Sequence, residues 1–210
     1  MLPIEIAIDL PLDINSVKGF LDREEGAALY RHALGVAATG PLLEVGSYCG
    51  KSTVYLGAAC KQAGSVLFAV DHHRGSEEHQ LGEEYHDASL YDIEFGKMDS
   101  FREFRYTLAR AQLEDTVIPI VASSALAART WTTPLAMVFI DGGHSMQAAL
   151  TDFHCWSNHV MRGGLLAIHD VFPNPADGGR PPFEIWQIAQ TSGLFAALPL
   201  VKSLGILKRL

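Results

Sequence analysis

The chain has 210 residues, 48% of them apolar, and a formal net charge of −8. This length suits a single domain over residues 1–210 with a sizeable buried core. Because the charges are scattered and acids outnumber bases, the composition argues against nucleic acid as a main partner, which needs a basic face. The three cysteines show no C-x-x-C spacing and the apolar runs are too short to span a membrane. We therefore expect a soluble, cytoplasmic protein without a disulfide framework or a zinc knuckle.

Predicted helices and buried strands alternate along the chain. The helices are expected at residues 22–38, 50–63, 97–112, 125–129, 145–159 and 183–192, and the strands at 42–46, 66–71, 117–122, 135–141 and 165–170, the last after a turn at Gly163 and Gly164. Two closing segments, 198–201 and 206–210, are expected to pair as an antiparallel hairpin. This alternation indicates an α/β fold with a mostly parallel sheet that is covered by helices on both faces.

Residues 72–96 differ from the rest of the chain in composition and in hydrophobic periodicity. They are polar, rich in histidine and acids, and show little periodicity. Loops of this length in a compact domain are usually functional or disordered. We predict that this insertion is a lid over a site; a solvated surface insertion is the alternative.

The stretch 42–53 combines an apolar run, the acid Glu44 and two glycines, Gly46 and Gly50, before a helical pattern begins. A strand, a tight loop and a helix start in this order place a helix N-terminus beside a ligand. The glycine spacing fits neither the dinucleotide fingerprint nor the phosphate loop. What remains, E-x-G-x-x-x-G, resembles motif I of the class I S-adenosylmethionine methyltransferases. A glycine-rich turn of another α/β protein is the alternative.

Ionisable residues end four of the predicted strands: Glu44, Asp71, Asp141 and the pair His169-Asp170. Ligands of open α/β sheets bind outside the carboxyl ends of the strands. Asp71 is placed to accept hydrogen bonds from a ribose hydroxyl pair. Asp141, His169 and Asp170 stand at neighbouring strand tips, about 4.8 Å apart, and can converge on one divalent ion, Mg²⁺ or Mn²⁺. Strand ends that simply need polar residues are the alternative.

His144 closes the run Asp141-Gly142-Gly143-His144. The glycines let the backbone fold back at the start of the next helix, so the imidazole can face the same pocket. An imidazole is near neutral and can take a proton, and we interpret His144 as a general base. A helix cap is the alternative.

Together these motifs resemble the metal-dependent class I methyltransferases, and within them the macrolide-sugar (macrocin-type) O-methyltransferases. The resemblance rests on residues 44–53, 70–71, 139–145 and 163–171. It implies a seven-stranded, Rossmann-like sheet, S-adenosyl-L-methionine as cofactor and a divalent metal. It also implies cofactor contacts from Glu44, Gly46, Ser47, Ser52, Asp71, Ser123 and Asp141, metal ligation by Asp141, His169 and Asp170, and His144 as the base.

The implied reaction is methyl transfer to a hydroxyl of a sugar or saccharide, with the metal lowering the pKa of the acceptor oxygen. The macrocin-type enzymes tend to have a carboxylate where His169 stands. The resemblance therefore supports metal ligation by His169 less strongly than ligation by Asp141 and Asp170. Catechol-type enzymes place a lysine where His144 stands, so His144 argues for a sugar acceptor. Residues 71–75 look like the small methyltransferases of mycobacterial methylated-polysaccharide pathways, which implies 1-O-methylation of a methylated mannoside.

Other interpretations stay open at this point. The acids and histidines at the strand ends also suit a two-metal phosphoesterase. The acceptor can be a catechol-type small molecule, and the chain can be a non-catalytic binding module on the same fold. The sequence leaves the oligomeric state open, with a homodimer among the alternatives.

Overall fold

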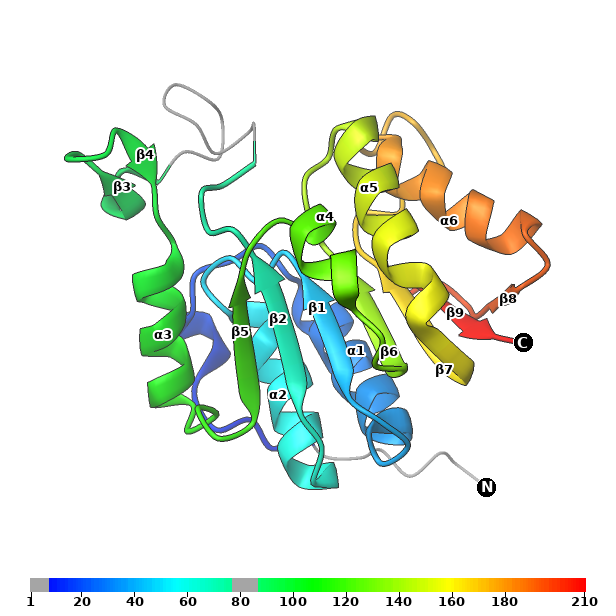
Figure 1. Ribbon diagram of the computed structural model, residues 1–210, viewed down its shortest axis with the longest axis horizontal. Coiled ribbons are helices and arrows are strands. Elements are labelled where there is room, and N and C mark those ends of the chain that lie inside the picture. The colour runs from blue at the N-terminus through cyan, green and yellow to red at the C-terminus, as the bar shows by residue number, and fades with distance from the viewer. Residues whose placement is uncertain (1–7, 77–86) are drawn as a thin grey trace.

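A computed structural model describes residues 8–76 and 87–210 of the chain. Within them, seven strands form one sheet in the order β5-β2-β1-β6-β7-β9-β8 (Figure 1). All neighbours are parallel except that β9 runs antiparallel to β7 and β8. The predicted α/β fold, mostly parallel with an antiparallel C-terminal hairpin, is confirmed. The strands are β1 Leu42–Val45, β2 Leu67–Asp71, β5 Val117–Val121, β6 Leu135–Ile140, β7 Val160–Ile168, β8 Phe195–Ala197 and β9 Gly205–Arg209.

Helices lie on both faces of the sheet (Figure 1). Successive residues of a strand point to opposite faces, so Leu42 packs in the core with α1, α2 and α3, and Leu43 packs in the core with α5 and α6. Every residue of β1 and β6 is buried, because both sides of these central strands are covered. The helices are α1 Arg23–Ala37, α2 Lys51–Ala63, α3 Phe101–Arg110, α4 Ser124–Ala127, α5 Met146–Trp156 and α6 Pro181–Thr191, with the 3₁₀ turns Ile14–Ser16, Ala88–Leu90, Ala128–Thr130 and Ser157–His159.

Local sequence signals explain the ends of the first helices. The Asp22 side chain accepts a hydrogen bond from the backbone of Glu24, and Asp22 forms a capping box with Glu25 at the start of α1. Gly64 ends α2 in the left-handed conformation, with φ of 68°. Both ends lie within one residue of the predicted boundaries.

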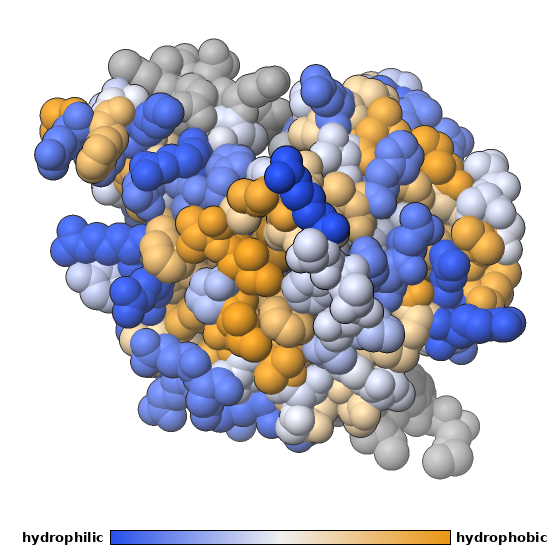
Figure 2. Space-filling view, in the orientation of Figure 1, coloured by the Kyte–Doolittle hydropathy of each residue, from blue (hydrophilic) through white to orange (hydrophobic). Residues whose placement is uncertain are grey.

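Helix α4 has four residues, and it leaves part of the sheet without a helical cover. In Figure 2 an apolar area occupies the region where β5, β2 and α4 lie in Figure 1. The exposed hydrophobic side chains of β5 and α4 are Ile118, Val121 and Leu126, which are 43%, 54% and 55% exposed. The edge of the sheet at β5 is therefore more apolar than the solvated surface of a typical edge strand.

Three predicted boundaries are wrong for identifiable reasons. Helix α3 begins at Phe101, because Lys97–Met98 pairs with Tyr91–Asp92 as the two-stranded sheet β4-β3. Strand β7 begins at Val160 and runs through Gly163 and Gly164, with a register shift against β6 where a turn was predicted. The first arm of the closing hairpin is β8, at 195–197, and the predicted arm at 198–201 contributes one isolated bridge from Val201.

The predicted lid at 72–96 lies partly outside the described residues, since 77–86 are not described. Its described C-terminal part contains the 3₁₀ turn and the β3-β4 pair, and Asp87 forms an ion pair with Lys18 at 2.6 Å. Covering of the site by this insertion stays a prediction. Among the described helices, none combines the length and apolarity that a membrane crossing requires.

The loop after β1 lies against the tip of β6. Gly46 has φ of 85°, and a Cβ atom on it would lie 2.0 Å from the carbonyl oxygen of Asp141. No side chain fits between these two backbones, so glycine is required on steric as well as conformational grounds.

We expect Gly46→Ala to lower the free energy of unfolding by at least about 3 kcal/mol, because it combines backbone strain with a backbone clash. Gly64→Ala is the matched control: its φ of 68° is also positive, but no atom lies within 4 Å of its Cβ position. The control should cost about 1–2 kcal/mol, the strain alone. Urea unfolding of both variants measures the difference, and equal costs would contradict the close approach.

Candidate active site

A cavity of about 490 Å³ opens at the carboxyl ends of the central strands. The predicted residues on its wall come from the ends of β1, β2, β5 and β6 and from the start of α5: Gly46, Asp71, Ser123, Asp141 and His144. The parallel sheet brings these tips to one edge, as the strand-end argument predicts. Residues 98 positions apart in sequence, such as Gly46 and His144, thus line one space.

Three of the predicted cofactor contacts are not on this wall. Glu44, Ser47 and Ser52 are buried in and beneath the glycine loop. Oε2 of Glu44 accepts a hydrogen bond from the Thr53 hydroxyl at 2.5 Å. Burial raises the pKa of the Glu44 carboxyl to about 8, although hydrogen bonds from Ser52 and Thr53 act in the opposite direction. In the structure, Glu44 supports the start of α2 from below.

Asp71 holds two loops at the edge of the cavity. One carboxylate oxygen accepts from the backbone N–H of Tyr48 at 2.8 Å, and the other accepts from the backbone N–H of His73 at 2.7 Å. Both donors have positive φ, 46° for Tyr48 and 57° for His73, so the carboxylate stabilises two unusual backbone turns. A carboxylate has about four acceptor sites, which leaves lone pairs for a ligand hydroxyl.

His73 is a structural residue that sequence reasoning assigned to the polar lid. It is buried, with its ring 5.0 Å from that of Phe101 and 5.2 Å from that of Phe104. Nδ1 lies 2.9 Å from the Ser100 hydroxyl. Burial lowers the pKa of His73, so the imidazole is neutral and serves as a core residue. No local pattern in the run of two histidines distinguishes this buried ring from its exposed neighbour.

Asp141, His144 and Asp170 form a cluster beside the cavity. Each offers one ligand atom, and these atoms lie within 4.8 Å of one another. Nε2 of His144 is 3.0 Å from Oδ2 of Asp170, which has a positive φ of 56°. Two carboxylates and one imidazole are a donor set that suits a hard or borderline divalent ion, so these residues fit the predicted metal. Burial would raise the pKa of Asp170, but hydrogen bonds from His144 and His169 outweigh it and lower that pKa well below its usual value.

His169 lies beneath this cluster with both ring nitrogens engaged. Nδ1 is 3.1 Å from Oδ1 of Asp141, and Nε2 is 3.0 Å from Oε2 of Glu25. Burial would lower the pKa of His169, but the charge of Asp141 and the surrounding carboxylates raise it far above its usual value. Both ring nitrogens of His169 thus face carboxylates, and the cluster of possible ligand atoms consists of Asp141, His144 and Asp170 without it.

Glu25 is a site-supporting residue that the sequence did not reveal. It is buried in the first turn of α1, and its Oε1 accepts from the backbone N–H of Ser203 at 2.9 Å and from the Ser203 hydroxyl at 2.7 Å. A hydrophobic pattern predicts the helix but gives no signal that one acid on it pairs with a histidine 144 positions away. Its role follows from the tertiary fold alone.

The comparison with protein families agrees with this geometry. A family model described as a methyltransferase domain matches residues 43–171, which is more than half of the chain. The matched region begins in β1 and ends just after the Asp170 tip. The chain belongs to this methyltransferase family.

Solved structures of methyltransferases share the fold. The O-methyltransferase NovP is 15% identical with a TM-score of 0.67, over 89% of this chain and 79% of that chain. TomG from Streptomyces achromogenes, an O-methyltransferase of tomaymycin synthesis in complex with SAM, is 14% identical with a TM-score of 0.62, over 90% and 81%. An O-methyltransferase from Bacillus cereus in complex with S-adenosylhomocysteine (SAH) is 15% identical with a TM-score of 0.61, over 93% and 85%. At such identities the likeness concerns the fold.

The raised pKa of Glu44 makes stability depend on pH. The unfolded carboxyl ionises near 4.5, whereas the folded one keeps its proton until about 8, so the native state loses stability as pH rises through this window. Glu44→Gln removes the ionisable group. We expect the variant to match the wild type near pH 5 and to be more stable near pH 8, by roughly 1–4 kcal/mol from the linkage relation. Urea unfolding across this range tests it, with the exposed Glu24→Gln as control; a constant difference would contradict the shift.

Proposed function

We propose that this methyltransferase uses S-adenosylmethionine and a divalent metal to methylate a hydroxyl group of a saccharide. The observation that carries the proposal is one cavity whose wall carries both a ribose-type carboxylate, Asp71, and His144, which lies 3.0 Å from the Asp170 carboxylate. A methyl donor and a deprotonated acceptor oxygen must meet in line, and these two groups line one space.

Several features support S-adenosylmethionine as the methyl donor. Gly46 and Asp71 both line the cavity, and Asp71 keeps lone pairs for ribose hydroxyls. The fold is also that of TomG and the Bacillus cereus enzyme, which were solved with SAM and SAH.

Asp141 and Asp170 are the residues that would hold the metal, and His144, the third member of the cluster, is assigned to the proton. A divalent ion bound there would lower the pKa of an acceptor hydroxyl by several units. His169 then acts as a positioning residue, because its ring holds the Asp141 carboxylate from below while Glu25 holds the ring.

His144 is proposed to take the proton from the acceptor hydroxyl. It lies on the cavity wall, and the Asp170 carboxylate at 3.0 Å orients its imidazole and stabilises the imidazolium that forms. As the new C–O bond forms, the C–S bond of the sulfonium breaks and its electron pair stays on sulfur. The proton leaves with His144, so the transfer is balanced without a further co-reactant.

A saccharide acceptor is supported by the residues around His144. The wall there carries the hydroxyl and amide side chains of Ser76, Ser145 and Gln147, which suit the hydroxyls of a sugar. The resemblance of residues 71–75 narrows this to a methylated mannoside as the first acceptor to test. A two-metal phosphoesterase is less well supported: the described residues contain one candidate cluster, and His73 is buried among aromatic rings away from it.

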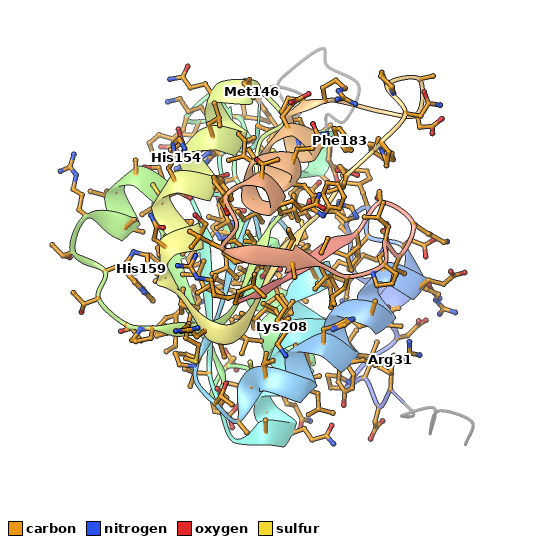
Figure 3. The ribbon with its side chains drawn as sticks, turned by 90° about the vertical axis from the view of Figure 1, so that its right-hand side faces the viewer. Arg31, Met146, His154, His159, Phe183 and Lys208 are labelled. Carbon is orange, nitrogen blue, oxygen red and sulfur yellow. The ribbon has the colours of Figure 1, made fainter. Side chains whose placement is uncertain are left out.

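We expect His144→Ala to lower kcat by roughly 10²–10⁴ and to leave the Kd for SAH within a factor of about two, because a base acts on the proton and not on cofactor binding. His154→Ala, on the exposed side of α5 (Figure 3), is the matched control and should retain full turnover. Turnover is measured by transfer of labelled methyl from SAM to a panel of saccharides, and the Kd by calorimetry. Wild-type turnover in His144→Ala would contradict the base.

We expect Asp141→Asn and Asp170→Asn each to weaken Mn²⁺ binding at least about tenfold, since each removes a charged ligand. Binding is measured by electron paramagnetic resonance on the apoprotein. The exposed Asp115→Asn should bind Mn²⁺ like the wild type. Full turnover of the wild type in EDTA would contradict the metal role, and SAH binding in neither EDTA nor Mg²⁺ would contradict the methyltransferase cofactor.

A further inference from the structure

Asp152 is a buried carboxylate on the cavity wall that the proposed chemistry does not use. It lies in the middle of α5, its residue surface is 8% exposed, and it lines the cavity together with Ala148 and Thr151 of the same helix. It belongs neither to the glycine loop nor to the metal cluster. A charged side chain in such a place is rare unless it has partners.

A short relay orients this carboxylate. The indole N–H of Trp156 donates to the Ser124 hydroxyl oxygen at 3.0 Å, so that hydroxyl can donate its own proton to another acceptor. That acceptor is Asp152, to which Ser124 is hydrogen-bonded. One hydroxyl donor satisfies one of about four acceptor sites on a carboxylate, so lone pairs remain on the cavity side.

Gly142 makes room for the same group. A Cβ atom at Gly142 would lie 2.4 Å from Oδ2 of Asp152, so any other residue at the tip of β6 would displace the carboxylate. Burial raises the pKa of Asp152, and Asp71 lines the same cavity. Gly142 and the Ser124 hydroxyl thus hold an acceptor group on the wall of the cavity that also contains Asp71.

The inference rests on the proposed function. If the ribose of S-adenosylmethionine binds Asp71, its purine lies against the adjoining wall, which is made by the Ser123–Ala125 segment, Gly142 and α5. When adenine is attached to ribose, its ring nitrogens are acceptors and its exocyclic amino group is the hydrogen-bond donor. We propose that Asp152 accepts a hydrogen bond from the exocyclic amino group of adenine and so determines the base specificity of the cofactor site.

The competing explanation is structural: Asp152 would only hold Ser124 and the short helix α4 in place. In that case its removal changes stability, and it affects ligands with and without the amino group equally. Recognition of the amino group predicts instead that the effect of the substitution depends on the ligand. A double-mutant cycle between Asp152 and the amino group separates the two.

The test is calorimetric titration with SAH and with the SAH analogue whose purine lacks the amino group. A hydrogen bond to a charged acceptor predicts that the wild type prefers SAH by roughly ten- to a hundredfold, and that Asp152→Ala binds the two ligands within a factor of about two. Asp152→Asn keeps the side-chain shape and a neutral acceptor, so its preference should fall to roughly two- to tenfold. This second variant carries the test if Asp152→Ala does not fold.

Asp71→Asn is the matched control, because it loses a carboxylate of the same cavity that faces the ribose both ligands share. It should weaken both ligands by the same factor and keep the preference for SAH. An equal preference in wild type and in folded Asp152 variants, or no preference in the wild type, would overturn the assignment of Asp152 alone. A wild type that binds neither ligand would overturn the proposed function as well.

Discussion

The contact between the backbones at Gly46 and Asp141 determines how the site is built. The loop after β1 passes so close to the tip of β6 that a Cβ atom at Gly46 would overlap the Asp141 carbonyl. This approach brings the loop after β1, Asp71 and Asp141 around one space. The Asp71 side chain then fixes the loop by accepting from the backbone of Tyr48. A looser packing of the two loops would separate Gly46 and Asp71 from Asp141 and His144.

A buried imidazolium controls the charge beneath the site. His169 lies between the carboxylates of Glu25 and Asp141, and each of its ring nitrogens has one of them as partner. Without this cation, buried carboxylates would repel one another and take up protons. Glu25 also binds Ser203, so the same cluster connects α1, the tip of β7 and the segment before β9. The His169 ring thereby fixes the position of the Asp141 side chain at the cavity.

The agreement between predicted and observed elements follows the strength of the local signals. Strand β6 is a continuous apolar run, β1 and β2 are apolar apart from Glu44 and Asp71, and α1 has its own capping residues. The β3-β4 pair has two residues in each strand, which is too short for a periodic pattern. Because of this pair, α3 begins four residues later than predicted. Gly163 and Gly164 predict a turn, but they lie within β7, at the register shift between Val160 and Leu165 where neither glycine is paired with β6.

By itself, the sequence determined the fold class, the alternation of elements and the strand-end residues Asp71, Asp141 and Asp170, because these depend on periodicity and on residues adjacent to a strand. The tertiary structure alone decided which side chains meet. In the folded chain His169 contacts Glu25, which is 144 residues away in the sequence. His144 contacts Asp170, and Asp152 lines the cavity. Such pairings arise from the packing of distant helices on a sheet, and no local pattern of residue types encodes them.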